Sequence, residues 1–68
     1  METIYLIQDI RTREYYGMYS GSQYFNTNIN DAINYSSEGE SLSDLSNIDL
    51  KDFFFGKTIE IKKYLIIA

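Results

Sequence analysis

The sequence contains no cysteine and no histidine. Without cysteine the chain can form no disulfide, and without either residue it cannot assemble the common zinc sites. Histidine is also the most frequent general base in enzymes, and the cysteine thiolate is a strong side-chain nucleophile. These absences predict a protein that is not an enzyme and that has no catalytic residues, no cofactor and no metal site.

Positive charge and long apolar runs are scarce as well. Six lysines and arginines stand against ten aspartates and glutamates, for a formal net charge of −4. No apolar run approaches the roughly 20 residues that a membrane-spanning helix needs. The opening METIYLIQDI carries an acid where a signal peptide carries basic residues. We therefore expect a cytoplasmic protein that does not bind a membrane.

Isoleucine and ring-bearing side chains are abundant. The chain has 68 residues, 16% of them aromatic, and this length predicts one domain over residues 1–68. Each aromatic side chain buries about 150–250 Å², so a compact core is feasible without disulfides or metals. Homodimerisation through an edge strand would add to that core and is compatible with the composition.

The start of the chain has a strand pattern. Residues 3–10, TIYLIQDI, have a β-branched and aromatic composition. Alternation puts Ile4, Leu6 and Ile10 on one face of this strand and Tyr5 and Ile7 on the other. Because both sets are apolar, both faces are expected to be partly covered.

Two further strands are predicted to follow. The charged run at residues 11–14 is a turn that leads into a second strand over residues 15–19. Gly21 permits another turn, because glycine tolerates positive φ. Residues 23–25 can then form a short third strand.

A first helix is predicted after these strands. Thr27 or Asn28 suits its N-cap, since either side chain can accept a hydrogen bond from a free backbone N–H group. Ile29, Ala32 and Ile33 follow at helical spacing. We therefore expect a helix that begins near residue 29.

A second short helix is predicted after a break at residues 36–40. Ser41 is expected to cap it, and Asn47 is expected to interrupt it. Gly56 suits the position that follows a helix C-terminus.

The end of the chain again has a strand pattern. Residues 57–68, KTIEIKKYLIIA, alternate, but Lys63 breaks the alternation, which predicts a bulge or a snorkelling side chain there. The helical segment can return this strand beside the first. The expected fold is α+β, β-β-(β)-α-β, with a small antiparallel-rich sheet and one or two short helices packed on one face.

This order of motifs resembles small ββαβ proteins encoded by phages and prophages. Their opening pattern Y-x-I-x-D-x-x-T-x-E-Y and the later pattern F-T-x-D-I-x-x-A-x-x-Y-x-S are matched here by Tyr5, Ile7, Asp9, Thr12, Glu14, Tyr15, Phe25, Thr27, Ile29, Ala32, Tyr35 and Ser36. The chain departs from the pattern after Ser36, where GESLSDLSNIDL replaces the usual helical continuation. The resemblance implies a host-takeover or anti-defence accessory protein, a category that includes anti-CRISPR proteins, acting in the cytoplasm of the host cell. No functional residue is carried over from it.

The stretch YYGMYSGSQYF, residues 15–25, holds four of the seven tyrosines. Because alternate strand residues point to opposite faces, about half of these rings must point away from the core. Exposed tyrosines are favoured at protein interfaces, where they offer a rigid area and a hydroxyl group. The candidate protein-binding tyrosines are Tyr15, Tyr16, Tyr19 and Tyr24.

Residues 31–52 form an acidic block. Six acids and one lysine give this block a net charge of −5, which repels nucleic acid and attracts basic surfaces. The acids, also candidate protein-binding residues, are Asp31, Glu38, Glu40, Asp44, Asp49 and Asp52. They either mimic a nucleic-acid backbone toward a host protein with a basic surface, or they form an ordinary solvated helix face.

Two functions follow from these features. The first is a non-catalytic inhibitor that binds a host defence or nucleic-acid-processing protein through the tyrosine-rich sheet, the acidic face, or both. The second is a small nucleic-acid-binding regulator that stacks bases on the same tyrosines. Its basic residues would be Arg11, Arg13, Lys57, Lys62 and Lys63, which could gather at one end of the sheet. The net negative charge favours the first function, because phosphate neutralisation supplies most of the affinity for nucleic acids.

Overall fold

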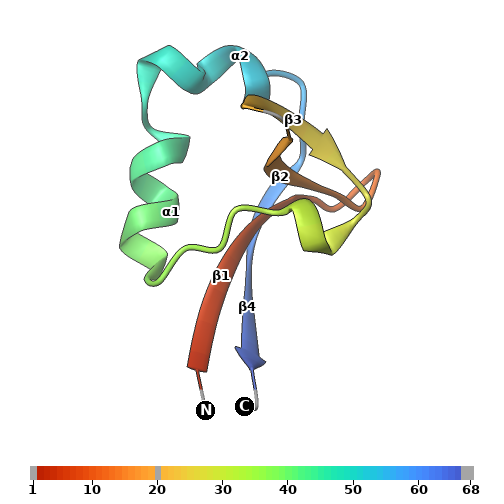
Figure 1. The fold of residues 1–68 in the computed structure, drawn as a ribbon. Helices are drawn as coiled ribbons and strands as arrows, with labels where there is room; N and C mark the ends of the chain where they lie inside the picture. Colours follow the sequence, from red (N-terminus) through yellow and green to blue (C-terminus); the bar gives the residue numbers. More distant parts are fainter. Residues whose placement is uncertain (1, 20, 67–68) are drawn as a thin grey trace.

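A four-stranded antiparallel sheet in the order β3-β2-β1-β4 forms the centre of the fold (Figure 1). The structure is a computed structural model that describes residues 2–19 and 21–66. Its strands are β1 (Glu2–Asp9), β2 (Glu14–Tyr19), β3 (Ser22–Asn26) and β4 (Ile59–Ile66). The α+β class with a small antiparallel sheet and short helices is confirmed.

The helical part of the chain consists of four short segments. They are η1 (Ile29–Asp31), α1 (Glu38–Leu45), η2 (Ile48–Leu50) and α2 (Lys51–Phe54), so the order of elements differs slightly from the expected β-β-(β)-α-β. Asn47 lies between α1 and η2, where its side chain accepts a hydrogen bond from the Asp49 backbone N–H group, and the predicted interruption is confirmed. Gly56 has a φ of 74° just after α2, the conformation expected there. No helix in the described ranges is long and apolar enough to cross a membrane.

The helix expected from residue 29 onward ends after three residues. The next residue, Ala32, is extended, with φ −68° and ψ 143°. The Ile33 N–H group donates to the Tyr16 carbonyl over 3.1 Å, and Tyr35 exchanges backbone hydrogen bonds of 3.0 and 2.9 Å with Tyr5. Residues 32–35 therefore lie between β1 and β2 instead of continuing the helix.

The close approach of this segment depends on Gly17 in β2. Strands β1 and β2 pair at Gln8–Tyr15 and Asp9–Glu14 near the hairpin, and β2 then bridges to Ala32 at Gly17. A Cβ atom added at Gly17 would overlap the carbonyl oxygen of the backbone that crosses it. A side chain at this position would therefore exclude residues 32–35 from the sheet.

The start of α1 also differs from the prediction. Ser37, not Ser41, is the N-cap, and its Oγ accepts a hydrogen bond of 3.2 Å from the Glu40 backbone N–H group. The Glu40 carboxylate in turn accepts a hydrogen bond of 3.2 Å from the Ser36 backbone N–H group. Ser41 is buried inside the helix and donates to the Glu38 carbonyl over 2.7 Å. The helix thus begins four residues earlier than expected, and the Glu40 side chain bonds to the N–H group of the residue before the N-cap, in a variant of the capping box.

The core lies between the sheet and the two α-helices. Ile7, Tyr16 and Tyr35 are buried there, and Leu45 of α1 and the phenylalanines of α2 pack against them. The Tyr16 ring centroid lies 4.9 Å from that of Phe54, 5.7 Å from that of Phe25 and 6.1 Å from that of Phe53. Tyr16 thus stands at the centre of an aromatic cluster that holds β2, β3 and α2 together.

Pairing between β1 and β4 is continuous. The register runs from Glu2 opposite Ile66 to Asp9 opposite Ile59 without interruption, so the bulge predicted at Lys63 is absent from this pairing. Lys63 lies opposite Tyr5 and is exposed. Because the pairing has no bulge, side chains alternate between the two faces along the whole of β1 and β4. This alternation determines which of them point away from the helices.

Candidate protein-binding face

The face of the sheet turned away from α1 and α2 carries the candidate site, and we call it the open face. Ile7 and Tyr16 point toward the helices, so their alternate neighbours point the other way. The strand residues on this face are Ile4, Leu6 and Gln8 of β1, Tyr15 of β2, Tyr24 of β3, and Glu60, Lys62, Tyr64 and Ile66 of β4. Leu6 and Gln8 are buried on it, with exposed fractions of 0% and 8%. Its β1 side chains include two aliphatic residues, as the sequence predicts.

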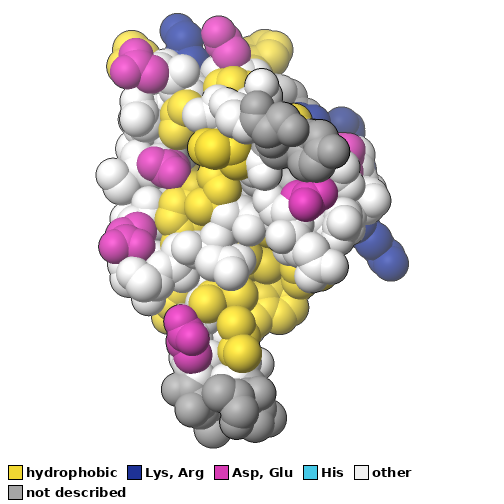
Figure 2. All heavy atoms as spheres, in the orientation of Figure 1, with side chains coloured by type: hydrophobic (Ala, Val, Ile, Leu, Met, Phe, Trp, Pro, Cys, Tyr) yellow, Lys and Arg dark blue, Asp and Glu magenta, His cyan; other side chains and the backbone are white. Residues whose placement is uncertain are grey.

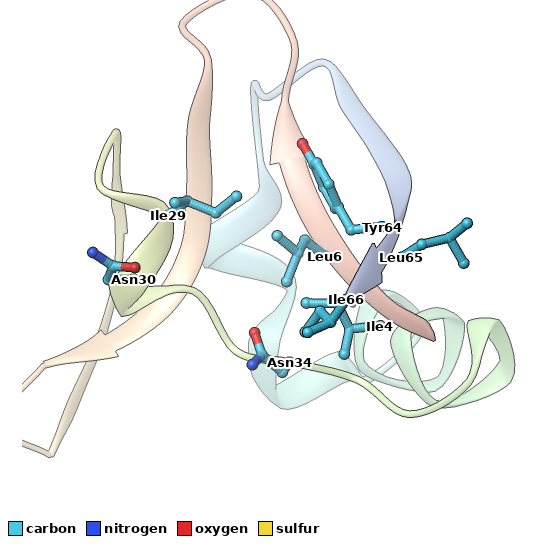
Figure 3. A pocket seen from close by; sticks show the side chains of 8 residues that line it. All are labelled: Ile4, Leu6, Ile29, Asn30, Asn34, Tyr64, Leu65 and Ile66. Carbon is cyan, nitrogen blue, oxygen red and sulfur yellow. The ribbon is translucent and has the colours of Figure 1, made fainter. Parts of the chain in front are cut away.

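An apolar groove of about 340 Å³ lies on the half of the open face nearest the chain termini. It is lined by Ile4, Leu6, Ile29, Asn30, Asn34, Tyr64, Leu65 and Ile66. Figure 3 shows Ile4, Leu6 and Ile66 close together, with Tyr64 rising beside them and Leu65 pointing away. The exposed fractions of Ile29, Leu65 and Ile66 are 43%, 60% and 39%, so a large part of the apolar rim is in contact with solvent.

A second hollow, of about 480 Å³, lies on the half nearest the β1–β2 turn, and we call it the basic hollow. It is lined by Gln8, Ile10, Arg13, Tyr15, Lys62, Lys63 and Tyr64. Three of the six basic residues of the chain meet here, and no acidic residue lines the hollow. The Lys62 ammonium makes an exposed ion pair of 3.2 Å with Glu60 of the same strand, which is weak in water.

A pair of tyrosine hydroxyl groups separates the groove from the hollow. The Tyr15 and Tyr64 hydroxyl oxygens lie 3.2 Å apart. Tyr15 stands opposite Gln8 and Tyr64 opposite Ile4, so the two rings reach toward each other along the sheet. The hydrogen bond to Tyr15, together with burial, raises the pKa of Tyr64 to about 12. Tyr64, which lines both cavities, is therefore uncharged at neutral pH.

The four candidate tyrosines do not lie together. Tyr15 and Tyr24 belong to the open face, and the Tyr24 hydroxyl donates to the Asp31 carboxylate over 3.0 Å. Tyr16 is only 1% exposed, so its assignment to a binding surface is corrected: it is a core residue. The side chain of Tyr19 lies outside the described residues.

Sequence reasoning missed Tyr64, which lines both cavities. The alternation at the end of the chain could have identified Tyr64, because it places this tyrosine on the opposite strand face from the apolar Ile59 and Ile61.

The six candidate acids are divided between internal hydrogen bonds and solvent. Asp44 accepts a hydrogen bond of 2.6 Å from the Tyr35 hydroxyl group, and Asp31 and Glu40 have the internal partners given above. Glu38, Asp49 and Asp52 are exposed. In Figure 2 the acidic side chains are spaced apart along the side formed by the helices. Within residues 2–19 and 21–66, no three acidic side chains gather closely enough to hold a metal ion.

The basic residues are gathered only in part. Arg13, Lys62 and Lys63 line one hollow, so three of the five residues that were expected to gather at one end of the sheet do so. The Lys57 ammonium instead lies 4.6 Å from the centroid of the Phe25 ring, on the side that the helices cover. Arg11 is exposed in the turn and does not line the hollow.

One buried carboxylate, Asp9, belongs to the hairpin turn. Its Oδ1 accepts a hydrogen bond of 3.1 Å from the Arg11 backbone N–H group. Burial alone would raise the pKa of Asp9, but the backbone N–H groups of Arg11 and Thr58 hold it below the ordinary value. The backbone carbonyl of Asp9 also accepts a hydrogen bond from Arg13, whose φ is 63°. Asp9 thus stabilises the turn that presents Arg13 to the basic hollow.

A scan against protein-family models found no match to this chain, and searches of curated proteins and of solved structures found none either. Function therefore has to be inferred from the residues themselves.

Proposed function

We propose that this chain is a non-catalytic protein-binding module that binds a partner protein through its open face. The observation that carries this proposal is the apolar groove beside the basic hollow, on a sheet face that α1 and α2 leave uncovered. Exposed apolar patches with a polar rim are typical of interaction sites. The amphipathic tyrosines Tyr15 and Tyr64 between the two cavities add the side chain most favoured at interfaces.

The open face supports this function better than the acidic block does. Three of the six candidate acids already accept hydrogen bonds within the fold, and the acids are spaced apart on the helical side. A nucleic-acid mimic needs carboxylates at regular, accessible positions. We therefore place the primary contact on the sheet and treat the acidic side as a solvated face.

The setting that we propose is an accessory protein of a phage or mobile element, acting in the host cytoplasm. Its partner would be a host defence or nucleic-acid-processing protein, whose activity is inhibited when the open face is occupied. The order of motifs from Tyr5 to Ser36 supports this setting.

A second candidate function is nucleic-acid binding. The gathering of Arg13, Lys62 and Lys63 beside Tyr15 and Tyr64 favours it, because cations beside aromatic rings bind single strands. Fluorescence anisotropy against single- and double-stranded oligonucleotides tests it. Submicromolar binding that weakens steeply with salt would support nucleic-acid binding in place of protein binding.

The protein-binding proposal is tested by affinity capture from a bacterial lysate with matched variants. Ile66→Lys places a charge at the rim of the apolar groove, whereas Ile48→Lys makes the same change at a residue of η2 that is 73% exposed. We expect Ile66→Lys to lose the captured protein and Ile48→Lys to retain it, with both variants folded by circular dichroism. Retention by Ile66→Lys, with loss on reversing the charges of Asp49 and Asp52, would move the site to the acidic face.

A further inference from the structure

Strand β4 is an edge strand that borders both cavities. It pairs with β1 on one side, and no strand within the described ranges pairs with its other side. Each of residues 62–66 lines either the basic hollow or the apolar groove. The other edge strand, β3, contributes no residue to either cavity. An edge of unpaired backbone N–H and C=O groups thus runs beside the open face along β4.

The chemistry of this edge changes along its length. Lys62 and Lys63 form a cationic half, and Tyr64, Leu65 and Ile66 form an apolar half. The register places Tyr64 opposite Ile4 and Lys62 opposite the buried Leu6, so the apolar half continues onto the neighbouring strand and the cationic half is confined to β4. A strand laid against β4 would meet cations at one end and apolar side chains at the other.

We infer that β4 accepts an extended acidic and apolar segment of a partner protein as a fifth strand. The inference rests on the proposed function and specifies the partner's chemistry. Backbone hydrogen bonds to the edge would supply affinity, and side-chain pockets would supply specificity. The partner's apolar side chains enter the groove beside Tyr64 and Ile66, and its carboxylates reach Lys62, Lys63 and Arg13.

A nucleic acid would use only half of this edge. Phosphates would be attracted to the basic hollow, but the apolar groove offers them no counterpart. A peptide matches the hollow and the groove at once.

A second copy of the chain is a poorer occupant. In the antiparallel register that pairs all eight residues of β4 with the same strand of another copy, residue 59 faces residue 66. Lys62 of each copy then lies opposite Lys63 of the other, and like charges directly opposite destabilise strand pairing. The lysines therefore oppose self-pairing and favour an acidic partner.

The inference is tested with fluorescein-labelled eight-residue peptides and fluorescence anisotropy. The probe has three valines followed by two glutamates, with threonine and serine elsewhere, and a second probe has the reverse order because a strand can add in either direction. The control peptides carry lysine in place of glutamate. We expect one acidic probe to bind, with amide NMR shifts concentrated in residues 59–66, and the lysine peptides not to bind.

Charge variants decide whether the lysines select the partner. Lys62→Glu/Lys63→Glu should weaken binding of the acidic probe by about tenfold or more and should permit binding of the lysine peptide. The milder Lys62→Gln/Lys63→Gln variant should give an intermediate loss. Lys51→Glu, an exposed position in α2, should leave binding unchanged.

Three outcomes would overturn the inference. Equal binding of the acidic and lysine peptides would show that the lysines do not select the partner by charge. NMR shifts confined to α1 and α2 would show that the peptide does not bind at β4. A stable dimer by sedimentation that Lys62→Glu/Lys63→Glu does not alter would make a second copy the occupant. If no peptide binds while Ile66→Lys still loses its captured protein, strand addition fails and the proposed function stands; if Ile66→Lys also retains that protein, both fail.

Discussion

Replacing Gly17 by alanine should expel residues 32–35 from the space between β1 and β2. A Cβ atom at this position would overlap the carbonyl oxygen of Asp31, and it would lie 2.8 Å from the Asp31 carbonyl carbon and 3.1 Å from Ala32 Cα. All three atoms belong to the backbone, so no change of rotamer can relieve the overlap. The crossing segment has to move as a whole.

The expected loss of stability is large for a chain of this size. Overpacking by one methyl group in a close-packed region costs about 1–3 kcal/mol. The hydrogen bond from Ile33 to the Tyr16 carbonyl is strained as well, which contributes about 1 kcal/mol. We therefore expect the free energy of unfolding to fall by about 2–4 kcal/mol. The midpoint of thermal unfolding should fall by about 8–32 °C, since 1 kcal/mol corresponds to about 4–8 °C in a domain of this length.

Gly39→Ala is the matched control for this change. Gly39 lies in the first turn of α1, and the nearest atom to an added Cβ is Ser37 Oγ at 3.8 Å, an ordinary contact. Alanine has a higher helix propensity than glycine by up to about 1 kcal/mol. The same substitution should thus be neutral or stabilising in α1 and destabilising in β2.

Urea unfolding followed by far-ultraviolet circular dichroism measures both variants, and hydrogen exchange at Ile33 and Tyr35 shows whether the crossing segment has loosened. Stability equal to the parent protein in Gly17→Ala, with both amides still protected, would refute the placement of residues 32–35 over Gly17.

Three further changes test the polar contacts. Tyr35→Phe should lower the free energy of unfolding by about 1.5 kcal/mol in urea titrations, because the 2.6 Å hydrogen bond to Asp44 has a charged but half-exposed acceptor. The lowered pKa of Asp9 contributes stability that is complete above its ordinary value of 3.8 and is lost as the pH falls through the lower folded value. Urea midpoints below pH 4 should therefore depend less on pH in Asp9→Asn. The pKa of Tyr64, raised from 10.0 to about 12, contributes stability that is present below pH 10 and lost between pH 10 and 12; Tyr64→Phe should remove that loss, as measured by urea midpoints across this range.

The parts of the fold that depend on short-range alternation were predictable. The two-residue period of β1 correctly separates Ile4 and Leu6 from Tyr5 and Ile7, because the side chains of any strand alternate regardless of its neighbours. Asn47 and Gly56 were placed correctly for a similar reason, since both act on the backbone within a few residues of themselves.

The region from Ile29 to Tyr35 was not predictable in this way. Ile29, Ala32 and Ile33 fit a helical period, but the backbone groups of Ile33 and Tyr35 find partners in strands that lie far away in the sequence. Those partners are accessible only because Gly17 has no side chain, and spacing along the chain cannot reveal that. The sequence does contain a signal for the start of α1, since Ser37 and Glu40 have the spacing of a capping box, and the prediction of Ser41 as the cap was wrong.

The sequence predicted which types of residue form the candidate site, but not which individual residues lie together in it. Which of Tyr15 and Tyr16 points outward depends on the register that the turn sets between β1 and β2, and the sequence leaves that register open. The sequence correctly predicted that Arg13 lies near Lys62 and Lys63 at one end of the sheet. The turn that Asp9 stabilises places Arg13 there.

A chain of 68 residues is short enough that its two α-helices can cover only one face of the sheet. An uncovered second face is therefore not by itself evidence of a binding site. A face left bare for that reason is expected to carry polar residues at alternate positions, as solvated faces of antiparallel sheets do. Here the rim of the groove instead carries the exposed apolar residues Ile29, Leu65 and Ile66, and β4 divides into a cationic and an apolar half. Because exposed apolar side chains such as Leu65 and Ile66 add nothing to the stability of the monomer, a partner that covers them would stabilise the fold by mass action. The arrangement of side chains on the open face, more than its exposure, therefore favours a binding function.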